Sequence, residues 1–284
     1  MYFSGTGTTE KTVKNIAAQI ARSLGSKAFI KADDIDFTPA ASRRQSYRFG
    51  PDDVVVFGVP VIAGRVPNVL LGFLDTLEGG DAIAVPVVLY GNRNYDDALI
   101  ELRNILEDKG FHTIAGAAFI GEHSFSKILA AGRPDEEDIK KAEIFAEAVA
   151  AKIRMLVGSS GGDDEKLLKL LQMAGPIEVK GEDPLRKYYQ PRDRNGEAIN
   201  ILKVKPKLNE AKCTGCGICV AACPMGSIKP GAPGIVDGIC IKCCGCEKKC
   251  PEGALYFDDP GYIYHKGELE FMYAGRRREP EVFI

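Results

Sequence analysis

The sequence predicts a doubly wound α/β domain with five parallel strands, followed by a linker and a small cysteine-rich domain. Two observations support this prediction. From residue 1 to about residue 157, short apolar runs alternate with segments of helical periodicity, which is the pattern of βαβ units. All nine cysteines lie between residues 213 and 250. We therefore expect domains at residues 1–157 and 203–284, joined by a linker with one short helix at residues 158–202.

The expected strands are short runs rich in valine, isoleucine and alanine. Those in the middle of the series are apolar at successive positions, as a parallel sheet covered on both faces requires. The runs cover residues 28–31, 54–59, 82–90 and 114–120, and Met1, Tyr2 and Phe3 precede them. In a sheet of order 2-1-3-4-5 the first strand is central, and strands usually have about five to six residues. We therefore expect either that the natural protein starts upstream or that the loop after this short strand is weakly anchored.

The expected helices repeat apolar residues at spacings of three and four, which gives each helix one buried face. These series cover residues 13–24, 98–106 and 139–153. A further helix is expected at residues 68–77, because Pro67 suits a first helical turn. Asp135 is placed to cap the helix that follows it.

The cysteines follow the spacing C-x2-C-x2-C-x3-C-P twice, with the second run 27 residues after the first, from 213 to 240. A disulfide framework is not expected in a long chain without a secretory leader. A four-cysteine zinc site would use two C-x2-C pairs with a longer spacer. Three cysteines at this spacing can instead wrap a [4Fe-4S] cluster while a fourth arrives from elsewhere. The duplicated run predicts a pseudo-twofold domain.

This spacing resembles that of bacterial two-cluster ferredoxins, in which the fourth cysteine is exchanged between the runs. The resemblance implies two [4Fe-4S] sites, each with three cysteines from one run and one from the other: Cys213, Cys216, Cys219 and Cys250, and Cys240, Cys243, Cys246 and Cys223. Pro224 and Pro251 fall where that pattern has prolines. Cys244 is left over, and we interpret it as a small buried residue beside a cluster.

The first loop reads SGTGTTEKT and follows the three-residue strand directly. A nucleotide-binding P-loop is disfavoured because Glu10 stands where its second glycine belongs, and the same residue breaks the dinucleotide fingerprint. Hydroxyl-bearing and small residues at a helix N-terminus can bind a phosphate with backbone N–H groups. The loop resembles the FMN phosphate loop of flavodoxins, which implies contacts from Ser4, Gly5, Thr6, Gly7, Thr8 and Thr9. A plain glycine-rich turn is the alternative.

Two further loops occupy strand ends at which a doubly wound sheet binds its ligand. They are GVPVIAGRVP at residues 58–67 and YGNRNYDDAL at residues 90–99. With these loops, the cysteine runs, the segments GEHSFS and AAGRPDEED, and the tail at residues 257–284, nearly the whole chain resembles the flavodoxin-ferredoxin fusions known as iron-sulfur flavoproteins.

This resemblance implies a flavodoxin-like doubly wound sheet of five parallel strands, a small α+β ferredoxin domain with two clusters, and FMN as a further cofactor. The implied FMN contacts on the two strand-end loops are Pro60, Val61, Ile62, Ala63, Gly64, Gly91, Asn92, Arg93, Asn94 and Tyr95. Tyr95 would stack on the flavin ring, and residues 91–94 would hold its pyrimidine edge. Ile62 departs from the family pattern, which often has an aromatic residue there.

The charge balance argues against nucleic acid and anionic membranes as partners, because 37 basic and 39 acidic residues give a net charge of −2. The longest apolar stretches are interrupted by glycine and proline, and they fall short of the roughly 20 residues that a membrane helix needs. No basic and apolar leader precedes them. We therefore expect a cytoplasmic protein with ferredoxin-like redox partners, and we leave its oligomeric state open.

These features favour electron transfer between two [4Fe-4S] clusters and FMN within one chain, as a low-potential carrier or adapter. The alternative is an enzyme, a flavin-dependent reductase of a small molecule that receives its electrons through the clusters. A redox sensor is disfavoured because the sequence has no dedicated output domain. His123 either delivers a proton near the flavin or is a structural histidine. The arginines 276–278 are interpreted as a solvated charge run.

Overall fold

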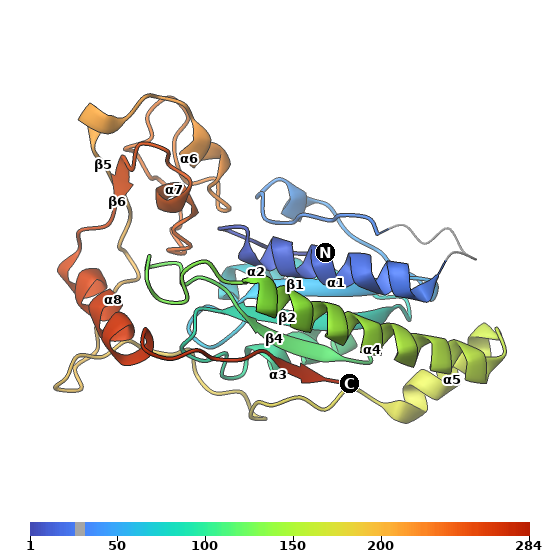
Figure 1. Cartoon of the computed structure of the whole chain (residues 1–284). Coiled ribbons are helices and arrows are strands. Elements are labelled where there is room, and N and C mark those ends of the chain that lie inside the picture. Colours follow the sequence, from blue (N-terminus) through green and yellow to red (C-terminus); the bar gives the residue numbers. More distant parts are fainter. Residues whose placement is uncertain (26–31) are drawn as a thin grey trace.

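A mostly parallel sheet forms the centre of the N-terminal half of the chain in the computed structural model, which describes residues 1–25 and 32–284 (Figure 1). Its longest strands, β1 (Val54–Pro60), β2 (Ile83–Tyr90) and β4 (Gly116–Ile120), pair in parallel in that order. The short β3 (His112–Thr113) pairs in parallel with the start of β2. At the edge, β7 (Glu281–Phe283) pairs antiparallel with β4. Three of the predicted apolar runs are therefore strands.

The first three residues extend the sheet on the other side of β1. Tyr2 bridges Asp36 and Gly58 in parallel, and its backbone N–H donates a hydrogen bond to the carbonyl oxygen of Ile35 at 3.0 Å. The order of the strands is thus 2-1-3-4-5, which is the flavodoxin-like order, and Tyr2 of the first strand pairs on both sides. The predicted strand at residues 28–31 lies outside the described residues.

Helices cover both faces of the sheet (Figure 1). One face carries α1 (Thr8–Leu24) and α4 (Glu136–Ser160), and the other carries α2 (Asn68–Leu74) and α3 (Ala98–Asp108). Because neighbouring residues of a strand point to opposite faces, Val56 packs with α1 and α4 whereas Phe57 packs with α2 and α3. Each face has its own hydrophobic core, as a doubly wound fold requires.

The long helix α4 begins at the predicted cap. Asp135 accepts a hydrogen bond from the N–H of Asp138 at 3.1 Å, and the Asp138 carboxylate accepts one from the N–H of Asp135 at 3.0 Å, which makes a reciprocal capping box. The helix ends at Gly161, whose φ of 70° suits a glycine at this position. A short helix, α5 (Asp164–Ala174), follows within the predicted linker. In the described part of the chain, no helix is sufficiently long and apolar to span a lipid bilayer.

The cysteine-bearing segment forms a small α+β unit beyond the carboxyl ends of the strands (Figure 1). In it β5 (Lys207–Leu208) pairs antiparallel with β6 (Leu255–Tyr256), and the short helices α6 (Ile218–Ala221) and α7 (Gly245–Lys248) lie between them in the sequence. The 3-10 turn η2 (Glu210–Lys212) belongs to this unit, whereas the 3-10 turn η1 (Ser42–Arg44) lies in the N-terminal half. The helices α6 and α7 start at equivalent places in the two cysteine runs, so the sequence repeat is also a structural repeat.

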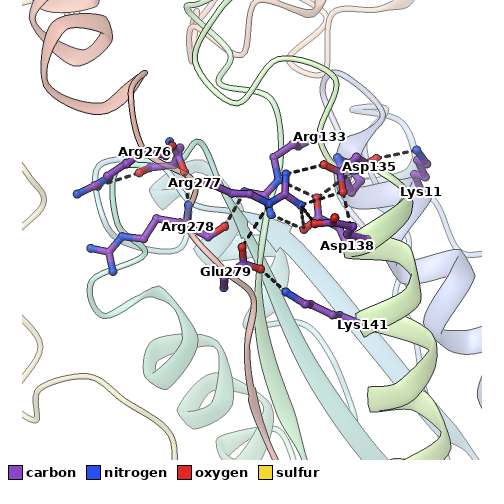
Figure 2. Close-up of polar contacts among 12 residues, drawn as sticks. Lys11, Arg133, Asp135, Asp138, Lys141, Arg276, Arg277, Arg278 and Glu279 are labelled. Atoms are coloured by element: carbon purple, nitrogen blue, oxygen red, sulfur yellow. Dashed lines mark hydrogen bonds and ion pairs between the residues drawn. The ribbon is translucent and has the colours of Figure 1, made fainter.

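After α8 (Pro260–Tyr273) the chain returns to the sheet, and Figure 2 shows how its tail is held. Arg277 forms an ion pair with Asp135 at 2.7 Å. Arg133 donates a hydrogen bond to the carbonyl oxygen of Arg278 at 2.6 Å. The three successive arginines, interpreted from the sequence as a solvated charge run, are therefore bonded to the N-terminal half. A tail that the sequence assigned to the second domain forms the edge of the first sheet.

Candidate functional site

A cavity of about 450 Å³ opens at the carboxyl ends of β1, β2 and β4. This is the edge at which doubly wound sheets bind their ligands, and the volume lies in the range of ligand pockets. Three strand-end loops supply its floor: residues 60–64, 90–94 and 121–125. From the predicted loops, the lining residues are Pro60, Val61, Ile62, Ala63, Gly64, Gly91, Arg93 and Asn94.

The loop before α1 supplies a wall of backbone N–H donors. Gly5, Thr6, Thr8 and Thr9 line the cavity, and the backbone N–H groups of these residues have no acceptor among residues 1–25 and 32–284. They lie at the N-terminus of a helix of 17 residues, where the helix dipole and free donors favour an anion. The donor set therefore fits a phosphate group.

Ser4 and Gly7, which the resemblance implies as FMN contacts, lie in the loop without lining the cavity. The Ser4 hydroxyl oxygen accepts hydrogen bonds from the N–H groups of Gly7 and Glu10, at 3.1 Å each. Gly7 has a φ of 99°, a conformation that glycine adopts without a steric penalty. These two residues shape the loop, and its remaining members face the cavity.

Tyr95 and Asn92 lie in the protein interior and not on the cavity wall. Only 3% of the Tyr95 surface is exposed, and its hydroxyl donates a hydrogen bond to Glu281 at 2.9 Å. The side-chain amide of Asn92 donates to the carbonyl oxygens of Tyr273 and Arg276, at 2.9 Å each. The Tyr95 ring in this position does not line the cavity, and both residues attach the C-terminal tail.

The predicted linker supplies a further wall that sequence reasoning missed. Tyr188 and Tyr189 line the cavity. The Tyr189 N–H donates to the carbonyl oxygen of Ala63 at 2.8 Å, and the guanidinium of Arg93 lies 4.4 Å from the centre of the Tyr189 ring. The two adjacent tyrosines are the sequence feature that could have indicated a binding wall here, because the surrounding segment has no helical or strand periodicity.

Two imidazoles face the cavity, His123 after β4 and His265 on α8. The His123 Nδ1 accepts a hydrogen bond from the N–H of Phe125 at 3.1 Å. Burial, with the positive charge of Lys248 adding to it, lowers the pKa of His123 to about 3. Burial also lowers the pKa of His265, with a smaller contribution from Arg93. Both rings are therefore neutral near pH 7, and the sequence offered no reason to select His265.

The thiols gather in two sets that cross the repeat. Cys213, Cys216, Cys219 and Cys250 line a small second cavity of about 20 Å³. Cys223 is close enough to Cys240, Cys243 and Cys246 to affect the ionisation of each. Each set combines three cysteines of one run with one of the other. The crossing is the one that the resemblance to two-cluster ferredoxins implies, although no group of three or more Cys, His, Asp or Glu side chains in the described residues is arranged to hold a metal ion.

Two of the thiols accept backbone hydrogen bonds of the kind that cluster ligands receive, whereas burial raises the pKa of Cys219, Cys240, Cys243 and Cys246. The N–H of Ser227 donates to the Cys223 sulfur at 3.4 Å, and the N–H of Ala254 donates to the Cys250 sulfur at 3.3 Å. Burial acts to raise the pKa of Cys250, but backbone N–H groups outweigh it and lower the pKa. Hydrogen bonds of this kind stabilise thiolate ligands. Cys244 instead packs in a small core with Tyr262, with its sulfur 3.4 Å from the hydroxyl oxygen.

The second thiol set directly adjoins the large cavity. Cys243 lines it, and a Cβ added to Gly5 would lie 2.9 Å from the Cβ of Cys243. On the other side of α7, the Lys248 ammonium donates to the carbonyl oxygens of His123 at 2.7 Å and Ser126 at 3.0 Å, and it is ion-paired with Glu122. The candidate phosphate loop and a candidate cluster site are therefore in contact.

Comparisons with known proteins match the two halves separately. Residues 206–229, which contain the first cysteine run, match the model of the 4Fe-4S binding domain family. Among solved structures, a similar chain is described as "Streptococcus pneumonia TIGR4 flavodoxin". It is 21% identical, the alignment covers 53% of this chain and 95% of that chain, and the TM-score is 0.37. The chain thus has a 4Fe-4S binding region at residues 206–229.

Proposed function

We propose that this chain transfers electrons between two [4Fe-4S] clusters and a bound FMN, as a redox carrier or adapter. One observation carries the proposal: Cys243 of the second thiol set and the donor-rich N-terminus of α1 line the same cavity. A flavin anchored by its phosphate at α1 would therefore adjoin a cluster. Electron transfer between them would need no movement of the chain.

Different residues would hold each group. The N–H groups of the loop at residues 5–9 would hold the FMN phosphate, and the loops at residues 60–64 and 91–94 would surround the rest of the molecule. The two crossed thiol sets would each hold one cluster. When bound, the clusters supply single-electron transfer and FMN supplies transfer of one or two electrons.

The exposure of the cysteines indicates which of the two thiol sets a partner protein would reach. Cys216 of the first set is exposed, whereas Cys243 of the second set is only partly exposed and faces the cavity. A ferredoxin-like partner would therefore exchange electrons at the first thiol set. The second set would connect that surface with the cavity.

The linker and the tail extend the proposed FMN-binding unit beyond residues 1–157. Tyr188 and Tyr189 of the linker close one side of the cavity, and β7 of the tail pairs with β4. We therefore divide the chain by function as an FMN-binding unit completed by the linker and the tail, and a cluster-binding unit around residues 207–256. The closed side of the cavity favours a second candidate function, a flavin-dependent reductase of a small molecule.

An anaerobic absorbance titration of the reconstituted chain tests the proposal. Protein with iron, sulfide and FMN is expected to show both flavin and cluster bands, and a reduced low-potential ferredoxin is expected to bleach both. NAD(P)H is expected to leave the bands unchanged, because the chain has no dinucleotide fingerprint. Absence of a flavin band, or clusters that bleach while the flavin stays oxidised, would contradict the proposed transfer.

A further inference from the structure

The linker wall borders the cavity next to the strand-end loop at residues 60–64. Tyr189 is bonded through its N–H to Ala63, and the Tyr188 hydroxyl donates to the carbonyl oxygen of Val66 at 2.9 Å. Upstream, the Arg186 N–H donates to the buried carboxylate of Asp97 at 2.8 Å. A flavin in the cavity would have this wall along one side. It can pass electrons back to the clusters or to a molecule small enough to share the cavity.

His265 is a polar group without a partner in this cavity. Its side chain is 6% exposed and lines the cavity. Neither ring nitrogen has a hydrogen-bond partner in residues 1–25 and 32–284, although the ring contacts Tyr189 and Phe125 with centroid separations of 6.0 and 6.3 Å. Among the described residues, only Asn15 Oδ1 is a buried side-chain polar atom without a partner, so the His265 nitrogens are open to the cavity and a ligand there can reach them. As a neutral ring it offers one N–H donor.

The charged side chains on the cavity wall already have partners. They are Arg93, which pairs with Asp96, Glu122, which pairs with Lys248, and Lys242, whose ammonium donates to the carbonyl oxygens of Leu202 at 3.1 Å and Cys240 at 2.8 Å. A charged ligand would find no free counterion on these groups. The wall therefore favours an uncharged ligand.

The flat rings of Tyr189 and Phe125 contact His265. Phe125, Tyr188, Tyr189 and His123 all line the cavity, and the centres of the His123 and Phe125 rings are 5.2 Å apart. Aromatic walls favour flat, conjugated ligands. A conjugated carbonyl compound has both features that the space selects, a flat apolar body and an oxygen that accepts a hydrogen bond.

We propose that the part of the cavity next to His265, Tyr189 and Phe125 binds an uncharged quinone-type compound, with a carbonyl oxygen accepting a hydrogen bond from the His265 ring. This inference rests on the proposed function, because it assigns that function an electron acceptor. Reduction of a quinone to its hydroquinone adds two electrons and two protons. The electrons come from a reduced ferredoxin through the clusters and the flavin, which are reoxidised, and the protons come from water.

Calorimetric titration of duroquinone into the oxidised full chain, loaded with FMN and clusters, tests the binding without any redox step. The wild-type protein is expected to bind one molecule. His265→Phe keeps a ring but removes both nitrogens, and it is expected to weaken binding about fivefold, the effect of one hydrogen bond. His265→Gln keeps an N–H donor and is expected to bind more tightly than His265→Phe. The matched control His112→Phe, in β3 and outside the cavity lining, is expected to bind like the wild type.

Flavin content, read from the absorbance of the same samples, separates the possible failures. Lack of duroquinone binding to protein that carries FMN and transfers electrons would overturn this inference alone. Equal binding by the wild type and His265→Phe would do the same. Loss of FMN from His265→Phe would assign His265 to the flavin site and overturn the inference. A wild-type chain that holds no FMN would overturn the proposed function and this inference together.

Discussion

Gly5 sets how closely the two candidate cofactor sites approach each other. A Cβ on this residue would lie 2.9 Å from the Cβ of Cys243 and 3.3 Å from its sulfur. Opposite it, a Cβ on Gly245 would lie 2.6 Å from the carbonyl oxygen of Gly5. Two glycines thus allow backbone to meet backbone between the α1 loop and α7. A single methyl group at this contact would push the thiol set away from the phosphate loop.

We predict that Gly5→Ala destabilises the loaded protein by about 1 to 3 kcal/mol, the usual effect of overpacking. The reason is the contact with Cys243, which belongs to a site with little freedom to move. Denaturant unfolding of the loaded protein measures the change. Gly158→Ala is the matched control, because a Cβ there meets nothing within 4 Å and alanine favours the helical backbone of α4. Equal unfolding midpoints for the two variants would show that the contact is not tight.

Tyr95→Phe is predicted to separate stability from flavin binding. Removal of the hydroxyl leaves Glu281 with one hydrogen bond fewer, and we expect a loss of about 1 kcal/mol. The FMN dissociation constant, from fluorescence titration of flavin-free protein, is expected to stay unchanged because the ring does not line the cavity. A weaker FMN complex would return Tyr95 to the flavin site.

At the scale of elements, the linker segment at residues 182–189 is fixed to the sheet by one buried carboxylate. Asp97 accepts hydrogen bonds from the N–H groups of Glu182 at 3.0 Å and Arg186 at 2.8 Å, and from the Arg186 guanidinium Nε at 3.0 Å. The Arg186 guanidinium, with these N–H groups, lowers the pKa of Asp97 from 3.8 to about 2. The linker wall of the cavity depends on this anchor.

Because the folded pKa of Asp97 is below its ordinary value, its contribution to stability is present above about pH 4 and is lost as the pH falls toward 2. We predict that Asp97→Asn is less stable than the wild type at pH 6 and that the difference shrinks between pH 4 and pH 2. Urea unfolding over this range measures it. Glu182→Gln changes an exposed partner of the same arginine, so its effect is expected to be small at every pH. A difference that grows on acidification would contradict the assigned role.

The strands and helices were predictable from the sequence where burial imposes a period. The runs that became β1, β2 and β4 are apolar at every position because both faces are covered, and the Asp135 cap follows from local chemistry. The linker wall and β7 were not predictable, because their positions depend on partners distant in sequence, such as Ala63 for Tyr189 and β4 for β7. In the site, Gly5, Thr6, Thr8 and Thr9 of the first loop line the cavity. Tyr95 does not, because Glu281 of the tail holds its hydroxyl.

At the scale of the whole molecule, the two thiol sets have different neighbours. The first lines its own small cavity, apart from the large one. The second reaches the large cavity through Cys243. Loss of a cluster from one set is therefore expected to differ in effect from loss of a cluster from the other.

Cys219→Ala is predicted to remove one cluster while leaving FMN bound, because Cys219 packs with residues of the cysteine-bearing unit and not with the sheet. About half of the iron should be lost, since the crossed sets divide the ligands equally. Iron analysis, flavin absorbance and circular dichroism of one sample provide the test. The variant is also expected to accept electrons from a reduced ferredoxin more slowly. Loss of all helical signal would contradict a sheet that folds independently of this set.

The return of the tail to the sheet has a consequence for how the two redox units move. The cysteine-bearing unit leaves the sheet through the linker and comes back through α8 and β7, so it is tied at both of its ends (Figure 1). A body on a single tether explores a wide volume, and its local concentration near a target falls as the tether lengthens. Attachment at two points removes most of that freedom. The rate of internal electron transfer should therefore be independent of protein dilution and nearly insensitive to solvent viscosity.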